Sequence, residues 1–152
     1  MRRFALWMST GLGIGYMPFA PGTFGTLWGV LIFYLTRELP WAWVAGGIVI
    51  FVFLAVYFAH VTEETLGSHD SSIIVLDEVV GYLVGVIAIP FSIKTMILAF
   101  LLFRLFDIVK PYPIRSIDRH WGGGWGVVMD DVLAGVFANI CLRLILWIWG
   151  IA

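Results

Sequence analysis

Six carboxylates lie within or beside the most apolar stretches of this chain: Asp77, Glu78, Asp107, Asp118, Asp130 and Asp131. An ionised carboxylate near hydrocarbon loses several kcal/mol of hydration free energy. Such groups persist when they are paired, hydrated or bound to a metal. Because hard divalent cations prefer oxygen ligands, we predict a metal site. The predicted metal ligands are Asp77, Glu78, Asp107 and Asp131.

A second set of charges falls at the end of an apolar segment, where Arg104, Asp107 and Lys110 recur every three residues. This spacing places all three on one face of a helix end. A lone ion pair would add only a few tenths of a kcal/mol. Here, however, Pro111 and Pro113 stop the helix and fix its exit direction. A cation beside a carboxylate at a rigid exit suits a phosphate held next to a metal.

The next segment combines basic residues with a glycine run. Arg115 and Asp118 belong to a short basic amphipathic stretch, which we expect to lie on the membrane surface. Gly123 and Gly124 belong to a predicted flexible loop whose backbone amides can approach a phosphate closely. The same run is equally consistent with a plain connector between helices.

The last predicted helix begins at about Met129 and opens with Asp130 and Asp131. Acidic residues at a helix start have an ordinary capping role. Two adjacent acids that lead into an apolar helix nevertheless favour a role in chemistry. The predicted catalytic groups are therefore Asp77, Glu78, Asp107, Lys110, Asp130 and Asp131.

A glycine and threonine motif near the N-terminus, residues 22–26, precedes an apolar segment. A loop of this kind before a helix can bind an anion through backbone amides. It lacks the lysine and the spacing of a P-loop. The predicted substrate-binding residues are Thr23, Thr26, Arg104, Arg115, Asp118, Gly123 and Gly124.

Composition points to a bilayer as part of the solvent. The 152 residues are enough for a single domain, which we expect to span 1–152. They are 61% hydrophobic and 12% charged, with a mean hydropathy of +0.99. A soluble domain carries about 25% charged residues and could not hide this much apolar surface.

Five apolar segments cover residues 26–36, 41–61, 73–89, 93–109 and 132–151. Their length and lack of alternation favour helices, and Pro40 and Pro90 mark two predicted helical turns. The two hairpins would bring the carboxylates to one end, together with most of the basic residues. The positive-inside rule then places that end in the cytoplasm. We predict an all-α, compact integral-membrane bundle of about five to six helices, with the polar site at its cytoplasmic end.

Four motifs cover most of the chain: 22–26; Asp77 and Glu78 with Gly81; 106–111 with Pro113; and 123–127, 129–132 and 134–135. With these motifs the chain resembles the phosphatidylglycerophosphatase A family of bacterial membrane lipid phosphatases. The resemblance implies an all-α fold and Mg²⁺-dependent hydrolysis of phosphatidylglycerophosphate to phosphatidylglycerol and inorganic phosphate. It does not assign a role to each carboxylate.

We therefore expect a phosphomonoesterase that uses Mg²⁺ and acts on an anionic phospholipid in the bacterial cytoplasmic (inner) membrane, with no nucleic-acid partner. Water and an aspartate remain alternative nucleophiles, and the oligomeric state stays open. One rival is a small cation-coupled transporter, which would need its carboxylates near mid-membrane. The other is a metal-dependent phospholipid-synthesis enzyme that joins activated alcohols to lipid, whose closely repeated aspartate signature the chain lacks.

Overall fold

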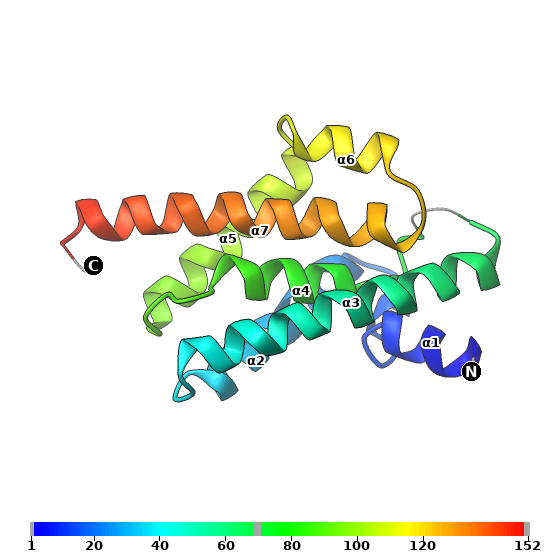
Figure 1. The fold of residues 1–152 in the computed structure, drawn as a ribbon, viewed down its shortest axis with the longest axis horizontal. Coiled ribbons are helices and arrows are strands. Elements are labelled where there is room, and N and C mark those ends of the chain that lie inside the picture. Colours follow the sequence, from blue (N-terminus) through cyan, green and yellow to red (C-terminus); the bar gives the residue numbers. More distant parts are fainter. Residues whose placement is uncertain (1, 69–70, 151–152) are drawn as a thin grey trace.

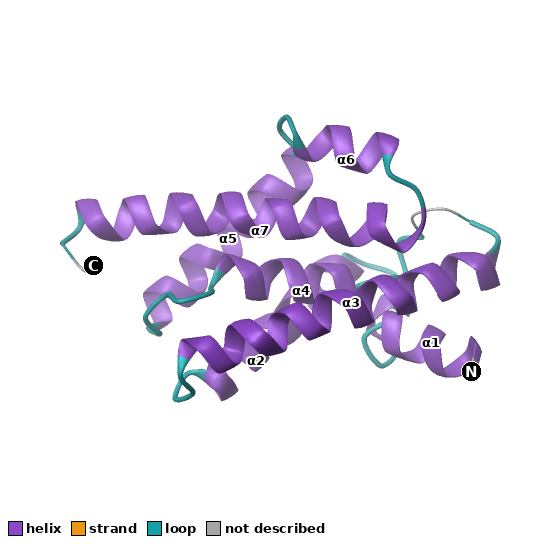
Figure 2. Cartoon of the chain, viewed as in Figure 1, coloured by secondary structure: helices purple, strands orange, loops and turns teal. Residues whose placement is uncertain are grey.

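The computed structural model describes residues 2–68 and 71–150, and it confirms the all-α prediction. This part of the chain holds seven α-helices, one 3₁₀ helix and no strand (Figures 1 and 2). The α-helices are α1 (Arg2–Ser9), α2 (Pro21–Thr36), α3 (Trp41–Leu66), α4 (Leu76–Gly85), α5 (Ile93–Val109), α6 (Ile114–His120) and α7 (Gly123–Ile148). The predicted count of five to six is too low, because the short helices α1 and α6 carry no long apolar run.

Helix boundaries follow the sequence signals most closely at the prolines. Pro40 immediately precedes α3, and the segment after Pro90 ends in a capping box that starts α5. There the Ser92 side chain accepts a hydrogen bond from the Thr95 backbone N–H, and the Thr95 hydroxyl accepts one from the Ser92 backbone N–H. Both predicted turns and the predicted span of the fourth segment, 93–109, are confirmed.

Several predicted boundaries are wrong. Residues 22–26, expected as a loop, lie within α2, which begins at Pro21, and the helix expected to end at residue 61 extends to Leu66. The last helix begins at Gly123 rather than Met129, so the expected glycine loop is the first turn of α7. The reason is tertiary, since a Cβ atom on Gly124 would overlap the Val56 carbonyl of α3. The predicted helix over 73–89 is also too long, because α4 spans only Leu76–Gly85. Side chains of α7 bond the carbonyl of Gly85 at its end and that of Ile87 just after it.

The short helix α4 occupies the centre of the molecule and packs most extensively on α7, with α2 and α3 also against it. Its Tyr82 is fully buried and its ring makes an edge contact with Phe103 of α5. Helices α4 and α7 cross so closely that a Cβ atom on Gly135 would overlap the Gly81 carbonyl oxygen, so the absence of a side chain at Gly135 permits this approach. This contact brings the first turn of α4 against the start of α7.

The longer helices run roughly along the long axis of the molecule, so most of their termini and the turns between them gather at its two ends (Figure 1). The α2–α3 turn, the α4–α5 connection and the last turn of α7 lie on the left in Figure 1, whereas α1 and the start of α7 lie on the right. Of the described helices, α3 and α7 are long and apolar enough to cross a membrane, with mean hydropathies of 2.3 and 1.8. Large apolar side chains such as Val49, Ile50 and Leu144 are exposed on them. These features support association with a membrane.

Candidate active site

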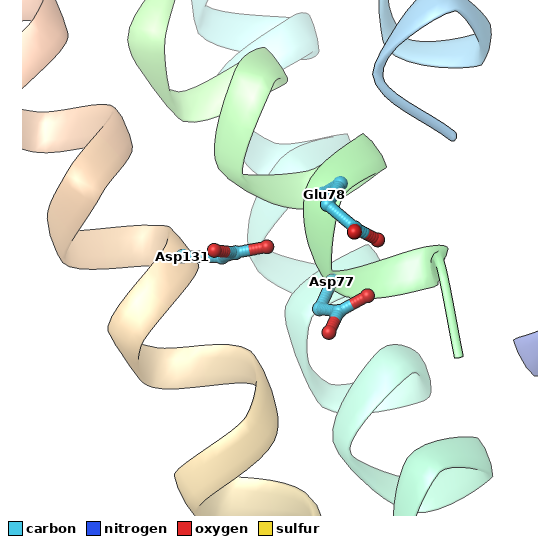
Figure 3. Close-up of side chains that lie close together, drawn as sticks. All are labelled: Asp77, Glu78 and Asp131. Atoms are coloured by element: carbon cyan, nitrogen blue, oxygen red, sulfur yellow. The ribbon is translucent and has the colours of Figure 1, made fainter. Parts of the chain in front are cut away.

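Three carboxylates from two helices converge where α4 meets α7. Asp77 and Glu78 lie in the first turn of α4, and Asp131 projects toward them from α7 (Figure 3). One oxygen of each lies within 4.8 Å of the others. Asp77 and Asp131 are only 8% and 4% exposed. The structure thus brings together three of the four predicted metal ligands. The fourth, Asp107, lines a cavity that these three carboxylates also line.

The start of α2 is shaped to receive Glu78. A Cβ atom on Gly22 would overlap Glu78 Oε1, and one on Gly25 would lie 3.5 Å from Glu78 Oε2. Glycine at these positions lets the backbone of α2 approach the carboxylate closely. The first glycine of the 22–26 motif therefore shapes this site by having no side chain.

Several of these acidic oxygens lack a partner although they are buried. Asp77 Oδ1, Glu78 Oε2 and Asp130 Oδ1 have no hydrogen-bond partner among the described residues. Burial raises the pKa of Asp77 well above its usual range, and the adjacent Glu78 charge adds to this effect. Burial, followed by repulsion from Asp131, raises the pKa of Glu78 to about 8. Packed carboxylates with unpartnered oxygens fit a divalent cation such as Mg²⁺.

Two basic side chains border the carboxylates. Arg104 Nη1 lies 2.6 Å from Asp107 Oδ2 and 4.0 Å from Glu78 Oε1. Lys110, which ends α5 in the left-handed conformation with φ 44°, places Nζ 2.5 Å from Asp118 Oδ1 and 2.6 Å from Asp130 Oδ2. Burial by itself would lower the pKa of Lys110, but its hydrogen bonds to both aspartates raise it above the usual value. Lys110 therefore stays charged and ties together α5, α6 and α7.

These groups surround a cavity of about 260 Å³ that is lined mainly by polar atoms. The lining residues are Ala20, Pro21, Gly22, Ser71, Ser72, Ile74, Asp77, Glu78, Arg104, Asp107, Lys110, Val127, Asp130 and Asp131. A cavity of similar size, about 250 Å³, lies by the α2–α3 turn and has Arg37 as its sole charged lining residue. Of these two cavities, the one lined by the carboxylates has both the oxygen ligands and the cations needed for metal-assisted phosphate chemistry.

Residues 7–146 match the phosphatidylglycerophosphatase A family. The chain belongs to this family. The match covers most of the sequence and confirms both the resemblance and the prediction of a lipid phosphatase.

Curated relatives agree with the family assignment. Phosphatidylglycerophosphatase A of Escherichia coli is 36% identical over 132 residues, which cover 86% of this chain and 77% of its own. The Haemophilus influenzae enzyme of the same name is 38% identical over 141 residues, covering 88% and 83%. A Bacteroides thetaiotaomicron protein, provisionally named phosphatidylinositol-3-phosphatase, is 41% identical over 152 residues, covering 94% of each chain. No solved structure matches the chain.

Some predicted substrate-binding residues of this chain lie away from the carboxylates. Gly123 and Gly124 border a different cavity, which also contacts His60 of α3. Arg115 is exposed on α6, and Thr26 is buried with its hydroxyl donating to the Gly22 carbonyl at 2.8 Å. Thr23 lies in the first turn of α2, next to the cavity-lining Gly22. The roles of these residues stay predictions.

Sequence reasoning missed part of the cavity wall. Ala20 and Pro21 line it from the start of α2, and Ser71 and Ser72 line it from the segment before α4. The proline–glycine pair at 21–22 was a usable signal, because proline favours the first turn of a helix. The serines gave none, since loop serines are common and nothing in their spacing links them to distant carboxylates. His69 and Asp70 lie outside the described residues.

Proposed function

We propose that this chain hydrolyses phosphatidylglycerophosphate to phosphatidylglycerol and inorganic phosphate with the help of Mg²⁺. Membership of the phosphatidylglycerophosphatase A family supports the reaction. The observation that carries the metal is the group of three carboxylates within 4.8 Å of one another, of which Asp77 and Asp131 are buried and Glu78 half-buried, with unpartnered oxygens on Asp77 and Glu78. Asp77, Glu78 and Asp131 would hold the ion, with Asp107 beside them.

When bound, Mg²⁺ supplies positive charge for the phosphate oxygens and makes water a stronger acid. The protein's cations complement it. Arg104 presents a planar guanidinium to two phosphate oxygens, while Lys110 acts as a point charge at the cavity wall. In the reaction a bond forms between water oxygen and phosphorus, and the bond from phosphorus to the glycerol oxygen breaks. The glycerol oxygen leaves with a proton, which gives the lipid alcohol.

Asp130 is suited to receive the proton of the attacking water. Its Oδ2 is held by Lys110 at 2.6 Å, whereas its Oδ1 is buried without a partner in the described chain. One oxygen is therefore positioned and the other is free to accept a proton. The alternative is attack by an aspartate followed by hydrolysis of an aspartyl phosphate. Acid-quenching the enzyme with ³²P-labelled substrate distinguishes the routes, since only the second leaves radiolabel on protein.

We further propose a multi-pass arrangement in the cytoplasmic membrane, with the cavity facing the cytoplasm. Two long apolar helices and the basic residues near the site support it. In a Cys141→Ala background, a cysteine replacing exposed Lys94 should react with an impermeant thiol reagent in intact cells, and one replacing exposed His120 should be shielded. The reverse pattern contradicts this orientation.

The headgroup is tested directly by phosphate release from defined lipids. Purified enzyme should release phosphate from phosphatidylglycerophosphate in mixed micelles with Mg²⁺ and lose this activity with EDTA. Phosphatidylinositol 3-phosphate belongs in the same assay, because the Bacteroides relative carries that name. A higher kcat/KM for the inositol lipid would reassign the substrate, and equal rates with and without Mg²⁺ would rule out the metal site.

A further inference from the structure

The carboxylate cavity is bordered by both α2 and α5. Gly22 lines the cavity from the start of α2, and Arg104 lines it from α5. The two are in close proximity, since a Cβ atom on Gly22 would lie 3.3 Å from Arg104 Nη1. The Arg104 side chain, which is 19% exposed, therefore lies across the boundary between these helices.

The two helices stay adjacent toward the opposite end of the molecule. There the Tyr34 ring of α2 makes an edge contact with the ring of Phe91, at 5.7 Å between centroids, and Phe91 lies just before α5. Both helices also pack against α4. The line between α2 and α5 thus runs from the carboxylate cavity to the α4–α5 connection.

Both helices carry exposed apolar residues at helical spacing. On α5 they are Ile97, Leu101 and Ile108, which are 52–70% exposed. With Arg104 they recur at intervals of four, three and four residues, so all four share one helix face. On α2 the exposed residues Leu27, Leu31 and Tyr34 recur at four and three. We call these six apolar residues, together with Arg104, the α2–α5 seam.

The dimensions of the seam suit one lipid of one leaflet. Ile97 and Arg104 are seven residues apart, which corresponds to about 10 Å along the helix, so the apolar stretch below Arg104 fits within one leaflet. Half of the hydrocarbon core of a bilayer is about 15 Å thick. A cation on a lipid-facing stripe is costly unless it is paired, and Arg104 is paired with Asp107 inside the cavity. Arg104 therefore links an apolar path to the site where a phosphate would be held.

We propose that the diacylglycerol part of the lipid phosphomonoester lies along the α2–α5 seam, while its phosphate passes Arg104 into the carboxylate cavity. The lipid then reaches the site sideways from the bilayer. Arg104 would meet the headgroup, and Leu101 and Ile97, which precede it along α5, would contact the chains below it. This inference rests on the proposed function, because it takes the lipid phosphomonoester as substrate.

Other exposed apolar faces provide the matched control. Ile140 and Leu144 of α7 are 52% and 55% exposed, comparable to the α5 residues. Neither residue lines the carboxylate cavity. Bilayer lipids should touch this face without any preference for a phosphomonoester headgroup.

Photo-crosslinking of the parent enzyme in phosphatidylcholine vesicles tests the seam. The probe is a phosphonate analogue of phosphatidylglycerophosphate, which cannot be hydrolysed, with a diazirine in one acyl chain. We expect labelled peptides from 97–108 and 27–34, and we expect unlabelled phosphatidylglycerophosphate to suppress them at least fivefold while extra phosphatidylcholine does not. Labelling at Ile140 and Leu144 should resist this competition. Equal labelling of both faces, or seam labelling that competitor leaves unchanged, would refute the seam.

A blocking variant adds a kinetic measurement. Leu101→Trp should lower kcat/KM for the diacyl substrate about tenfold relative to that for the deacylated headgroup ester, because a larger side chain fills the path. Leu144→Trp should leave this ratio unchanged. Equal ratios in both variants would count against the seam even if the parent remains fully active. A parent without phosphatase activity on any lipid phosphomonoester would instead refute the proposed function.

Discussion

The two ends of α4 are both polar and both face α7, yet they are built in opposite ways. At the first turn, Asp77 and Glu78 meet Asp131, and acidic oxygens remain without partners in the described chain. At the last turn, every named polar group has a partner. Asn139 Nδ2 donates to the Gly85 and Ile87 carbonyls at 3.0 and 3.1 Å.

Arg143 completes the second cluster. Its Nε donates to Asn139 Oδ1 at 2.8 Å, and its Nη2 donates to the Ile87 and Ala88 carbonyls at 2.9 and 3.2 Å. These bonds satisfy carbonyls that a helix end leaves free, and a cation there also favours the helix dipole. A fully bonded polar cluster stabilises the fold, whereas a buried cluster with free oxygens is ready for a ligand.

Asp131 and Asn139 lie on the same face of α7, separated by Gly135 at intervals of four residues. Spacing alone therefore cannot tell the ligand site from the structural cluster. The hydrogen-bond partners distinguish them, and this difference can be tested by substitution at each end.

The largest expected effect is at the acidic end. Asp77→Asn should lower kcat by about 10²- to 10³-fold, comparable to the loss of one group that stabilises transition-state charge. In detergent with EDTA the unfolding temperature should stay within a few degrees of the parent, because the amide is isosteric and removes repulsion. Steady-state kinetics and thermal unfolding check both. A variant with at least half the parent rate would exclude Asp77 from the site.

Lys110 should affect both properties, since it contacts Asp130 and Asp118. Lys110→Met should reduce kcat/KM about 10²-fold and lower the unfolding temperature, because Asp130 is left buried and unpaired. Adding Asp130→Asn should recover part of the stability without recovering activity. If the double variant is no more stable than Lys110→Met, the ion pair contributes little to the fold.

Removing the metal should destabilise the parent selectively. At a Mg²⁺ concentration of about 100 times Kd, binding to the folded state adds about 2.7 kcal/mol. For a chain of this size we expect EDTA to lower the unfolding temperature by about 5–10 °C. Asp131→Asn should show a much smaller shift, since it lacks one ligand. Identical shifts in parent and variant would mean that the metal binds elsewhere.

The smallest expected effect is at the basic end, and it should be on stability only. Arg143→Met should lower the free energy of unfolding by about 1–3 kcal/mol, because the Ile87 and Ala88 carbonyls lose a donor. The folded variant should keep the parent kcat. Lys94→Met, which removes an exposed cation near the same end of the molecule, is the control and should change neither quantity. A large loss of kcat in Arg143→Met would contradict a purely structural role.

The sequence by itself determined the helical class, both proline-marked turns and the acidic residues of the site. These follow from local properties: apolar length, proline geometry and the cost of a carboxylate near hydrocarbon. It also placed Arg104 and Asp107 on one face of α5, because a helix repeats every 3.6 residues. Lys110 instead follows the helix in the left-handed conformation and pairs with Asp118 and Asp130. The start of α7 was missed, since glycine in isolation favours a loop.

Only the tertiary structure decided what each polar residue meets. The close contact of Gly81 with Gly135 sets which turn of α7 faces the start of α4, and so joins Asp131 to Asp77. Packing against α3 makes Gly124 helical, which takes it away from the carboxylates. Contacts between residues far apart in the chain depend on how whole helices pack, and no local pattern encodes that. The same packing gives Asn139 and Arg143 their carbonyl partners and leaves Asp77 and Glu78 with oxygens free for a ligand.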